Sequence, residues 1–149
     1  MKVTMTASGH KELQQHMKKV PAEKKKRINA ESYAAGVDVH REAIKNLKGN
    51  AWHIGELAGS MRVDRIKGGD AVEVGPTALH GPYVEYGTKA HFPPLKALEK
   101  WAKDHGFDSA WPVALKISKK GTPAQPFLLP AYLGVVNKYY NRLKEILRK

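Results

Sequence analysis

The sequence predicts an α+β fold, on three observations. Apolar residues recur at three- and four-residue spacing over residues 21–47 and again over 130–149, which is typical of amphipathic helices. Apolar and polar residues alternate over 60–67 and 71–75, on either side of a Gly-Gly-Asp turn. The run Tyr83-Val-Glu-Tyr-Gly-Thr88 alternates as well. We therefore expect a small antiparallel β-sheet packed with a long N-terminal helix, an inserted helical segment and a C-terminal helix.

Length and composition fit a single domain. Residues 1–50 form its helical N-terminal part, and residues 51–149 hold the sheet, the helical insert and the C-terminal helix. No run of 18 apolar residues is present, so we expect no membrane span and no membrane partner. The N-terminus has no apolar signal segment, which favours synthesis in a cytoplasm. The absence of cysteine excludes disulfides, thiol nucleophiles and thiolate metal sites.

The chain is strongly basic, with 26 Lys and Arg against 14 acidic residues and a formal net charge of +12. This balance predicts attraction to polyanions such as nucleic acid, acidic protein surfaces or anionic membranes. A well-solvated basic surface is an equally good interpretation. The candidate DNA-facing residues are Lys24, Lys25, Lys26 and Arg27, and a second basic run spans 144–149.

Two helices are predicted before the sheet. Ser8 is a fair N-cap for a helix over residues 9–19, and Pro21 closes that helix and opens the next one. The second helix would be about 40 Å long at 1.5 Å per residue. Two shorter helices broken near Gly36 are the alternative. The apolar face of this region is narrow and rich in alanine, which suits packing against another helix or a neighbouring subunit; its residues are Ala30, Ala34, Val37 and Ile44, flanked by Ile28 and Leu47.

A hairpin is expected next. Residues 51–59 contain Gly55 and Gly59 and are predicted to form a loop and a short turn. On the following strand Met61, Val63 and Arg65 share one face, and on the returning strand Val72 and Val74 face together. Residues 76–81 are expected to be a loop.

The central strand is predicted over Tyr83–Thr88, with Tyr83, Glu85 and Gly87 on one face and Val84, Tyr86 and Thr88 on the other. Gly87 indicates a bulge, a sharp exit or a close backbone approach. Glu85 is the one carboxylate in a rigid aromatic setting. A structural role, accepting hydrogen bonds from backbone groups or arginine, is favoured over that of a catalytic base.

The C-terminal half is predicted to hold three helices. Residues 94–105 and 111–121 form the insert, and each begins near a proline and ends at a glycine. Residues 121–130 follow an extended path fixed by three prolines; Phe127, with Leu128 and Leu129, anchors this segment on the sheet and launches the last helix. The predicted core stripe of that helix consists of Leu133, Val136, Tyr140, Leu143 and Leu147, and the opposite face carries Lys138, Arg142, Lys144, Arg148 and Lys149.

No catalytic constellation is evident. The sequence has no P-loop and no Gly-x-Ser-x-Gly elbow, and its histidines form no His-x-x-x-His pair. His53 with Glu56 is better interpreted as a solvated pair than as a metal site. An enzyme using Glu85 with His80 or His91 has no spacing argument behind it. We expect no enzymatic activity, no cofactor and no metal.

Three segments in this order resemble the tail-completion (head–tail joining, neck) proteins of long-tailed bacteriophages, the gene-product-ten-like family. They are Ile54-Gly-Glu-Leu-Ala-Gly-Ser60, Tyr83–Thr88 and Pro126-Phe-Leu-Leu-Pro-Ala131, followed by an amphipathic helix. Ile54 stands where members of the family usually have threonine. The residues that carry the resemblance are Gly55, Leu57, Ser60, Tyr83, Glu85, Tyr86, Gly87, Thr88, Pro126, Phe127 and Pro130.

The resemblance implies a non-enzymatic structural protein of the virion, made in the host cytoplasm. Such proteins assemble as a ring, expected to have six subunits, at the end of the tail that meets the head. The implied partners are further copies of the chain, the head connector or adaptor, the tail terminator or tube proteins, and DNA passing through the lumen. The second hypothesis is a nonspecific nucleic-acid-binding protein that uses Lys24–Arg27 and the basic C-terminal helix.

Overall fold

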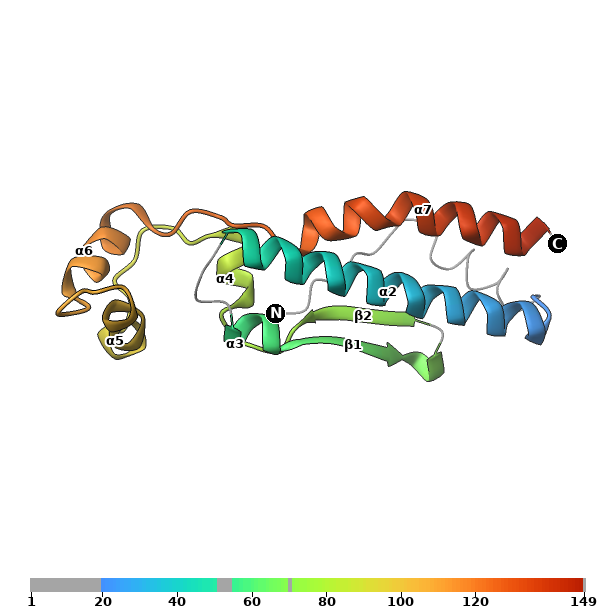
Figure 1. Cartoon of the computed structure of the whole chain (residues 1–149), viewed down its shortest axis with the longest axis horizontal. Coiled ribbons are helices and arrows are strands. Elements are labelled where there is room, and N and C mark those ends of the chain that lie inside the picture. The colour runs from blue at the N-terminus through green and yellow to red at the C-terminus, as the bar shows by residue number, and fades with distance from the viewer. Residues whose placement is uncertain (1–19, 51–54, 70, 149) are drawn as a thin grey trace.

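The computed structural model describes residues 20–50, 55–69 and 71–148, and shows a long helix between a second long helix on one side and a β-hairpin on the other, with a small helical lobe at one end (Figure 1). The α+β class is confirmed. The helix predicted over residues 9–19 lies outside the described residues. The described elements are α2 (Ala22–Asn50), α3 (Gly55–Gly59), β1 (Met61–Ile66), the 3₁₀ turn η1 (Lys67–Gly69), β2 (Ala71–Pro76), α4 (Gly81–Tyr86), α5 (Leu95–Asp104), α6 (Trp111–Lys120) and α7 (Leu128–Arg148).

The helix α2 is continuous through Gly36, so the alternative of two shorter helices is wrong. The hairpin lies directly against the helix at this residue. A Cβ atom at position 36 would be 2.6 Å from Val72 Cγ1 and 3.2 Å from Val63 Cγ1. A side chain here would hold the hairpin away from the helix, because short branched valines cannot move aside.

The buried face of α2 differs from the predicted one. Ala30 and Ala34 are exposed, and Val37 and Ile44 are only partly buried. The helix packs against α7 on one side and the hairpin on another, so its buried surface covers a wider arc than a single stripe. Of the predicted residues, Ile44 packs against the core and the flanking Ile28 and Leu47 are buried, whereas Ala30 and Ala34 lie outside this arc. The buried apolar residues are Ile28, Ala35, Val39, Ala43 and Leu47.

The hairpin matches the prediction closely. β1 and β2 pair antiparallel, with Val63 opposite Val74 and Arg65 opposite Val72. The connection uses positive φ angles at Lys67, Gly68 and Gly69. Arg65 extends over the ring of Tyr33 in α2, with its guanidinium carbon 4.3 Å from the ring centroid, which adds a cation–π contact between hairpin and helix.

The predicted central strand is wrong. Residues Gly81–Tyr86 form the helix α4, and only Thr88 is extended, in a single bridge with Thr122. Pro82 lies in the first turn and Gly87 follows the last residue, which is the proline and glycine placement that short helices favour. The described part of the sheet therefore has two strands. Gly55–Gly59, predicted to be a loop and a short turn, also forms a short helix.

The last helix begins at Leu128 rather than Pro130, and its buried face is not the predicted stripe. Ala131, Val135 and Ile146 face α2, whereas Leu133, Tyr140 and Leu147 are about half exposed. The helix carries apolar residues over a wide arc, and the smaller ones make the contact with α2.

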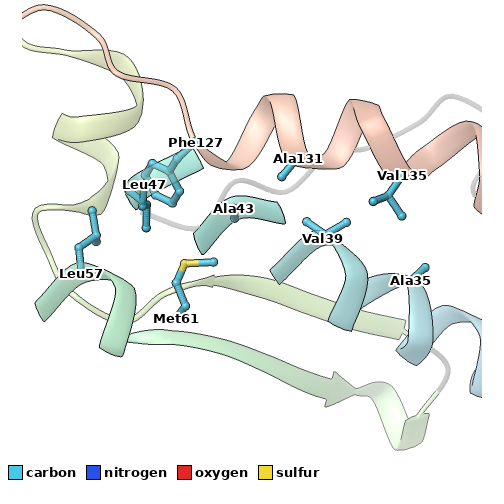
Figure 2. Packing of buried hydrophobic residues seen from close by; sticks show 9 residues of the cluster. All are labelled: Ala35, Val39, Ala43, Leu47, Leu57, Met61, Phe127, Ala131 and Val135. Carbon is cyan, nitrogen blue, oxygen red and sulfur yellow. The ribbon is translucent and has the colours of Figure 1, made fainter. Parts of the chain in front are cut away.

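A single core joins the helix pair to the hairpin and to α3 (Figure 2). Phe127 is the largest fully buried side chain, with 2% of its surface exposed, and it stands at the start of α7 beside Leu47. The side-chain amide of Asn46 in α2 donates a hydrogen bond of 2.9 Å to the Phe127 carbonyl. The members of this core are Ala35, Val39, Ala43, Leu47, Leu57, Met61, Phe127, Ala131 and Val135.

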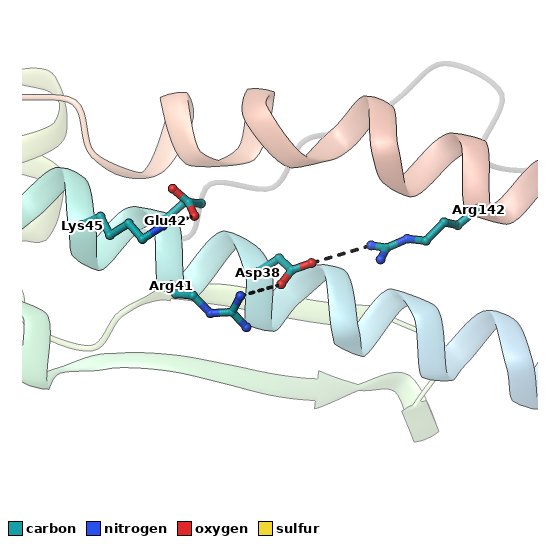
Figure 3. A network of polar contacts seen from close by, with 5 residues as sticks. All are labelled: Asp38, Arg41, Glu42, Lys45 and Arg142. Carbon is teal, nitrogen blue, oxygen red and sulfur yellow. Dashed lines mark hydrogen bonds and ion pairs between the residues drawn. The ribbon is translucent and has the colours of Figure 1, made fainter.

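Ion pairs connect the two long helices on their partly exposed side (Figure 3). The guanidinium of Arg142 lies 3.1 Å from Glu31 and 3.8 Å from Asp38, and Asp38 also pairs with Arg41 at 3.4 Å. Arg142 therefore faces α2 and does not belong to the outward basic face on which it was predicted. The side chains of Arg142, Glu31 and Asp38 are about a third exposed, whereas that of Arg41 is 62% exposed. The paired atoms Glu31 Oε2, Arg142 Nε and Arg142 Nη2 are shielded from solvent, so water screens this link between the helices less than it screens a surface pair.

Replacing Phe127 with alanine is expected to lower the free energy of unfolding by about 3–5 kcal/mol, because it empties the centre of the core. Chemical denaturation of both proteins measures the difference. Leu79→Ala is the matched control, since Leu79 is 90% exposed and its truncation should change stability by less than about 0.5 kcal/mol. Equal losses for the two variants would refute the anchoring role of Phe127.

Candidate assembly surfaces and the junction that positions them

The buried carboxylate of Glu85 joins α4 to the first turn of α7. Its Oε2 accepts hydrogen bonds from the backbone N–H groups of Phe127 at 2.8 Å and Leu128 at 2.9 Å, and its Oε1 accepts one from Leu129 at 2.9 Å. The first N–H groups of a helix have no partner inside the helix and carry its positive dipole end. Glu85 thus caps α7 from an element 42 residues away in sequence.

This arrangement gives Glu85 a structural role. Both of its oxygens are engaged by backbone donors, so the carboxylate is held as an acceptor and is poorly placed to take a proton from a substrate. The extended segment after Gly121 was predicted to dock on the sheet. It instead pairs with Thr88 and with α4, where the Gln125 N–H donates to the Val84 carbonyl at 2.8 Å.

A narrow neck leaves the body beside this junction. The backbones of Thr88 and Thr122 exchange hydrogen bonds of 3.0 and 3.2 Å, and their hydroxyls lie 3.0 Å apart. Gly87 and Gly121 precede the two threonines, each with φ of 69°. A Cβ atom at Gly87 would lie 2.5 Å from the Thr122 carbonyl oxygen, so both the positive φ and the close approach require glycine.

The remaining motif residues lie around α3 and α4 without forming one pocket. Leu57 is buried in the core. The Ser60 hydroxyl donates to the Leu57 carbonyl at 2.8 Å and accepts from the Ala78 N–H at 3.3 Å, which ties α3 to the segment before α4. Gly55 is exposed, as are Pro126 and Pro130. Tyr83 and Tyr86, three residues apart on α4, are 61% and 55% exposed and share its outer face.

The stripe predicted as the core of α7 is instead about half exposed at Leu133, Tyr140 and Leu147 and partly buried at Val136 and Leu143, and the exposed Leu129, one turn earlier, extends it. Its spacing alternates between four and three residues, as in the seam of a coiled coil. Burial raises the pKa of the neighbouring Tyr132 phenol, and the nearby Tyr140 and Tyr139 raise it further, so three tyrosines cluster along one edge of this surface. We name these residues the α7 stripe: Leu129, Leu133, Val136, Tyr140, Leu143 and Leu147.

A second uncovered surface lies on α2. Ala30 and Ala34 are exposed, and Val37 and Ile44 are partly buried. These residues were predicted to pack against another helix or a neighbouring subunit. Ile44 packs against the core, and we name the other three, Ala30, Ala34 and Val37, the α2 outer face. Its side chains are small, whereas those of the α7 stripe are large.

The basic residues converge at one end of the molecule. The start of α2, the hairpin turn and the end of α7 lie together there (Figure 1). Arg27 lines a surface hollow together with Glu31, Arg142, Glu145 and Ile146, so the start of α2 and the end of α7 meet there. Acidic residues lie among the basic ones as well: Glu23 and Glu31 on α2, Asp64 and Glu73 on the hairpin, and Glu145 on α7. We name this surface the cationic end; its basic residues are Lys24, Lys25, Lys26, Arg27, Arg65, Lys67, Lys144 and Arg148.

Within the described ranges, no three His, Asp or Glu side chains are grouped as metal ligands. No helix among those residues is long and apolar enough to cross a bilayer. The features that stand out among the described residues are the exposed apolar and basic surfaces. The neck is defined by close backbone approaches and the α7 stripe by its exposure. Neither property can be read from the spacing of residues in the sequence.

Comparison with known proteins gives one match. A family model, HK97-gp10_like, described as "Bacteriophage HK97-gp10, putative tail-component", matches residues 11–87, just over half of the chain. The matched residues run through α2, the hairpin and α4 and end at the neck. Neither the curated proteins nor the solved structures compared with the chain include a match.

Glu85→Ala is expected to lower the free energy of unfolding by at least about 1–3 kcal/mol, the cost of leaving a buried donor without an acceptor. Glu85→Gln should lose less, because its amide oxygen still accepts a hydrogen bond, though without the charge. Denaturant melts measure both variants. Glu99→Ala, on the exposed surface of α5, is the control, and a Glu85→Ala melt that matches it would contradict the capping role.

Proposed function

The chain belongs to the HK97-gp10-like family of bacteriophage tail components, and we propose that it completes the tail and joins it to the head as a ring around the DNA channel. A tail component acts in the virion, and its partners are other virion proteins. The proposed role is structural and requires no catalysis.

The observation that carries this proposal is the exposure of the α7 stripe. Leu129, Leu133, Tyr140 and Leu147 are each 46–56% exposed, although their spacing is that of a helix-packing seam. Uncovered apolar surface of this extent marks an interface in soluble proteins. The stripe therefore supports association through α7.

A ring needs two different surfaces on each subunit that fit one another, since identical patches give closed dimers. The α7 stripe and the α2 outer face meet this requirement. The large side chains of the stripe can enter the low surface left by Ala30 and Ala34 on the next subunit, as ridges enter grooves. We propose six copies in the ring, from the resemblance to tail-completion proteins.

The other proposed partners lie above and below the ring. The head connector or adaptor would contact one side, and the tail terminator or tube proteins the other. DNA passing through the lumen would meet a protein of net charge +12, which favours a polyanion at short range.

Deleting the gene from the parent phage or prophage should give DNA-filled heads and complete but unattached tails in electron micrographs of lysates. The wild-type gene supplied in trans should restore joined particles. A Leu133→Glu/Leu147→Glu variant should not restore them, because two charges would enter the proposed subunit interface.

Leu79→Glu is the matched control, since Leu79 is a 90% exposed leucine outside the α7 stripe, and it should restore joining. Normal joined particles in the deletion strain would overturn the joining role. Full restoration by the stripe variant would overturn the proposed interface.

The convergence of basic residues favours a second candidate, nonspecific nucleic-acid binding at the cationic end. Lys26, Arg27, Lys144 and Arg148 are exposed there, and they come from two elements that are distant in sequence. Phosphate contacts of this kind give affinity that falls steeply with salt and does not depend on base sequence.

This candidate predicts that Lys24→Ala/Lys26→Ala/Arg27→Ala reduces the slope of log affinity against log salt by about 1 for each phosphate that the variant no longer neutralises. Binding of a 30-base-pair duplex, about three helical turns, measures the slope. Lys96→Ala/Lys100→Ala/Lys119→Ala removes the same charge from the distant lobe and should leave the slope unchanged. Equal slopes for the wild type and both variants would overturn nucleic-acid binding at the cationic end.

A further inference from the structure

We propose that the helical lobe formed by residues 89–121 is a docking module for an acidic protein of the virion. The lobe consists of α5, α6 and their connections, and projects from the body beyond the neck (Figure 1). The inference rests on the proposed function only in placing the partner in the phage particle. The residues that match the family end at Gly87, so the lobe lies outside the match.

The buried side chains of the lobe are mostly alanines, whereas three of its aromatic rings are about half exposed. Its buried apolar residues are Ala102, Ala110, Ala114 and Ile117. Phe92 and Trp111 are 54% and 51% exposed, and Phe107 is 43% exposed. A unit that packed only on itself would bury its aromatic rings first, because large apolar side chains gain most from burial.

Aromatic rings of the lobe, the exposed ones among them, form two contacting pairs. Phe92 and Trp111 contact each other with centroids 5.6 Å apart, and Phe107 stacks on Trp101 at 6.0 Å. Tryptophan and phenylalanine at the centre of a patch are typical anchors of protein interfaces. Rings that already pack on one another in pairs suit a preformed protein pocket better than the splayed platforms that stack nucleic-acid bases.

Charge identifies the kind of partner. The lobe carries seven exposed lysines against three acidic residues: Lys89, Lys96, Lys100, Lys103, Lys116, Lys119 and Lys120 against Glu99, Asp104 and Asp108. A partner with an apolar centre and an acidic rim complements this surface. A second copy of the chain would not, because its own net charge is +12.

The neck holds the lobe where a partner can reach it. The Thr88–Thr122 bridge and the adjacent glycines fix where the lobe leaves the body. The lobe and the cationic end lie at opposite ends of the molecule (Figure 1). A protein bound to the lobe would therefore leave the cationic end free for DNA.

Site-specific photocrosslinking in phage-producing cells tests the proposal. A benzophenone amino acid at Phe92 of the full-length protein is expected to form an adduct with a virion protein of net negative charge, identified by mass spectrometry. The same photoprobe at Leu79, exposed on the body, should not give this adduct. Lys96→Glu/Lys119→Glu should reduce the adduct about tenfold, whereas Lys48→Glu/Lys138→Glu should leave it unchanged.

An adduct with DNA, an adduct with a second copy, a basic protein partner or no adduct at Phe92 would each overturn the proposal. So would an adduct that resists charge reversal in the lobe. The result is independent of the joining role. Joined particles after gene deletion, together with an adduct to an acidic protein, would overturn the joining role and support the docking role. Unattached tails after gene deletion, without an adduct, would support the joining role and overturn the docking role.

Discussion

The structure depends on one carboxylate. Glu85 gathers the backbone N–H groups at the start of α7, and this contact fixes several things at once. It sets the start of the helix at Leu128, it holds Phe127 over the core, and it places the extended segment beside α4. Because the bonded groups are 42 to 44 residues apart, the same contact closes the chain around the whole inserted lobe. Without it, a helix end with unpaired donors would lie against the core, which is costly.

The packing of the two long helices explains why so much apolar surface remains outside. Ala35, Ala43 and Ala131 lie at the contact, and small side chains let the helices approach closely. The larger residues of α7 then have nothing to cover within one chain. The body of this protein thus has a packed core but leaves large apolar residues of α7 exposed. Subunits that bury such residues only in an assembly share this property.

How far the sequence predicts this structure depends on the kind of signal. The hairpin and the two lobe helices follow from local chemistry, because glycine turns, proline starts and glycine ends act over a few residues. The run from Tyr83 to Thr88 was misassigned because six residues are too few to separate a period of two from a helical turn, and its flanking Pro82 and Gly87 were the better indicators.

For the candidate surfaces, periodicity locates an apolar face but cannot say whether it covers the chain's own core or a neighbour. The α7 stripe was found in this way and assigned to the wrong side, whereas the α2 pattern left both another helix and a neighbouring subunit open as its partner. The residues that form the Glu85 junction were recognised separately, yet their meeting was not predictable, because it is set by tertiary contacts across the lobe.

The neck has broader consequences. Thr88 and Thr122 lie side by side where the chain leaves the body and returns to it, so the length and content of the intervening segment are uncoupled from the helix pair. Such an insertion point lets selection exchange the lobe, and with it the proposed docking partner, while the helix pair and the hairpin stay intact.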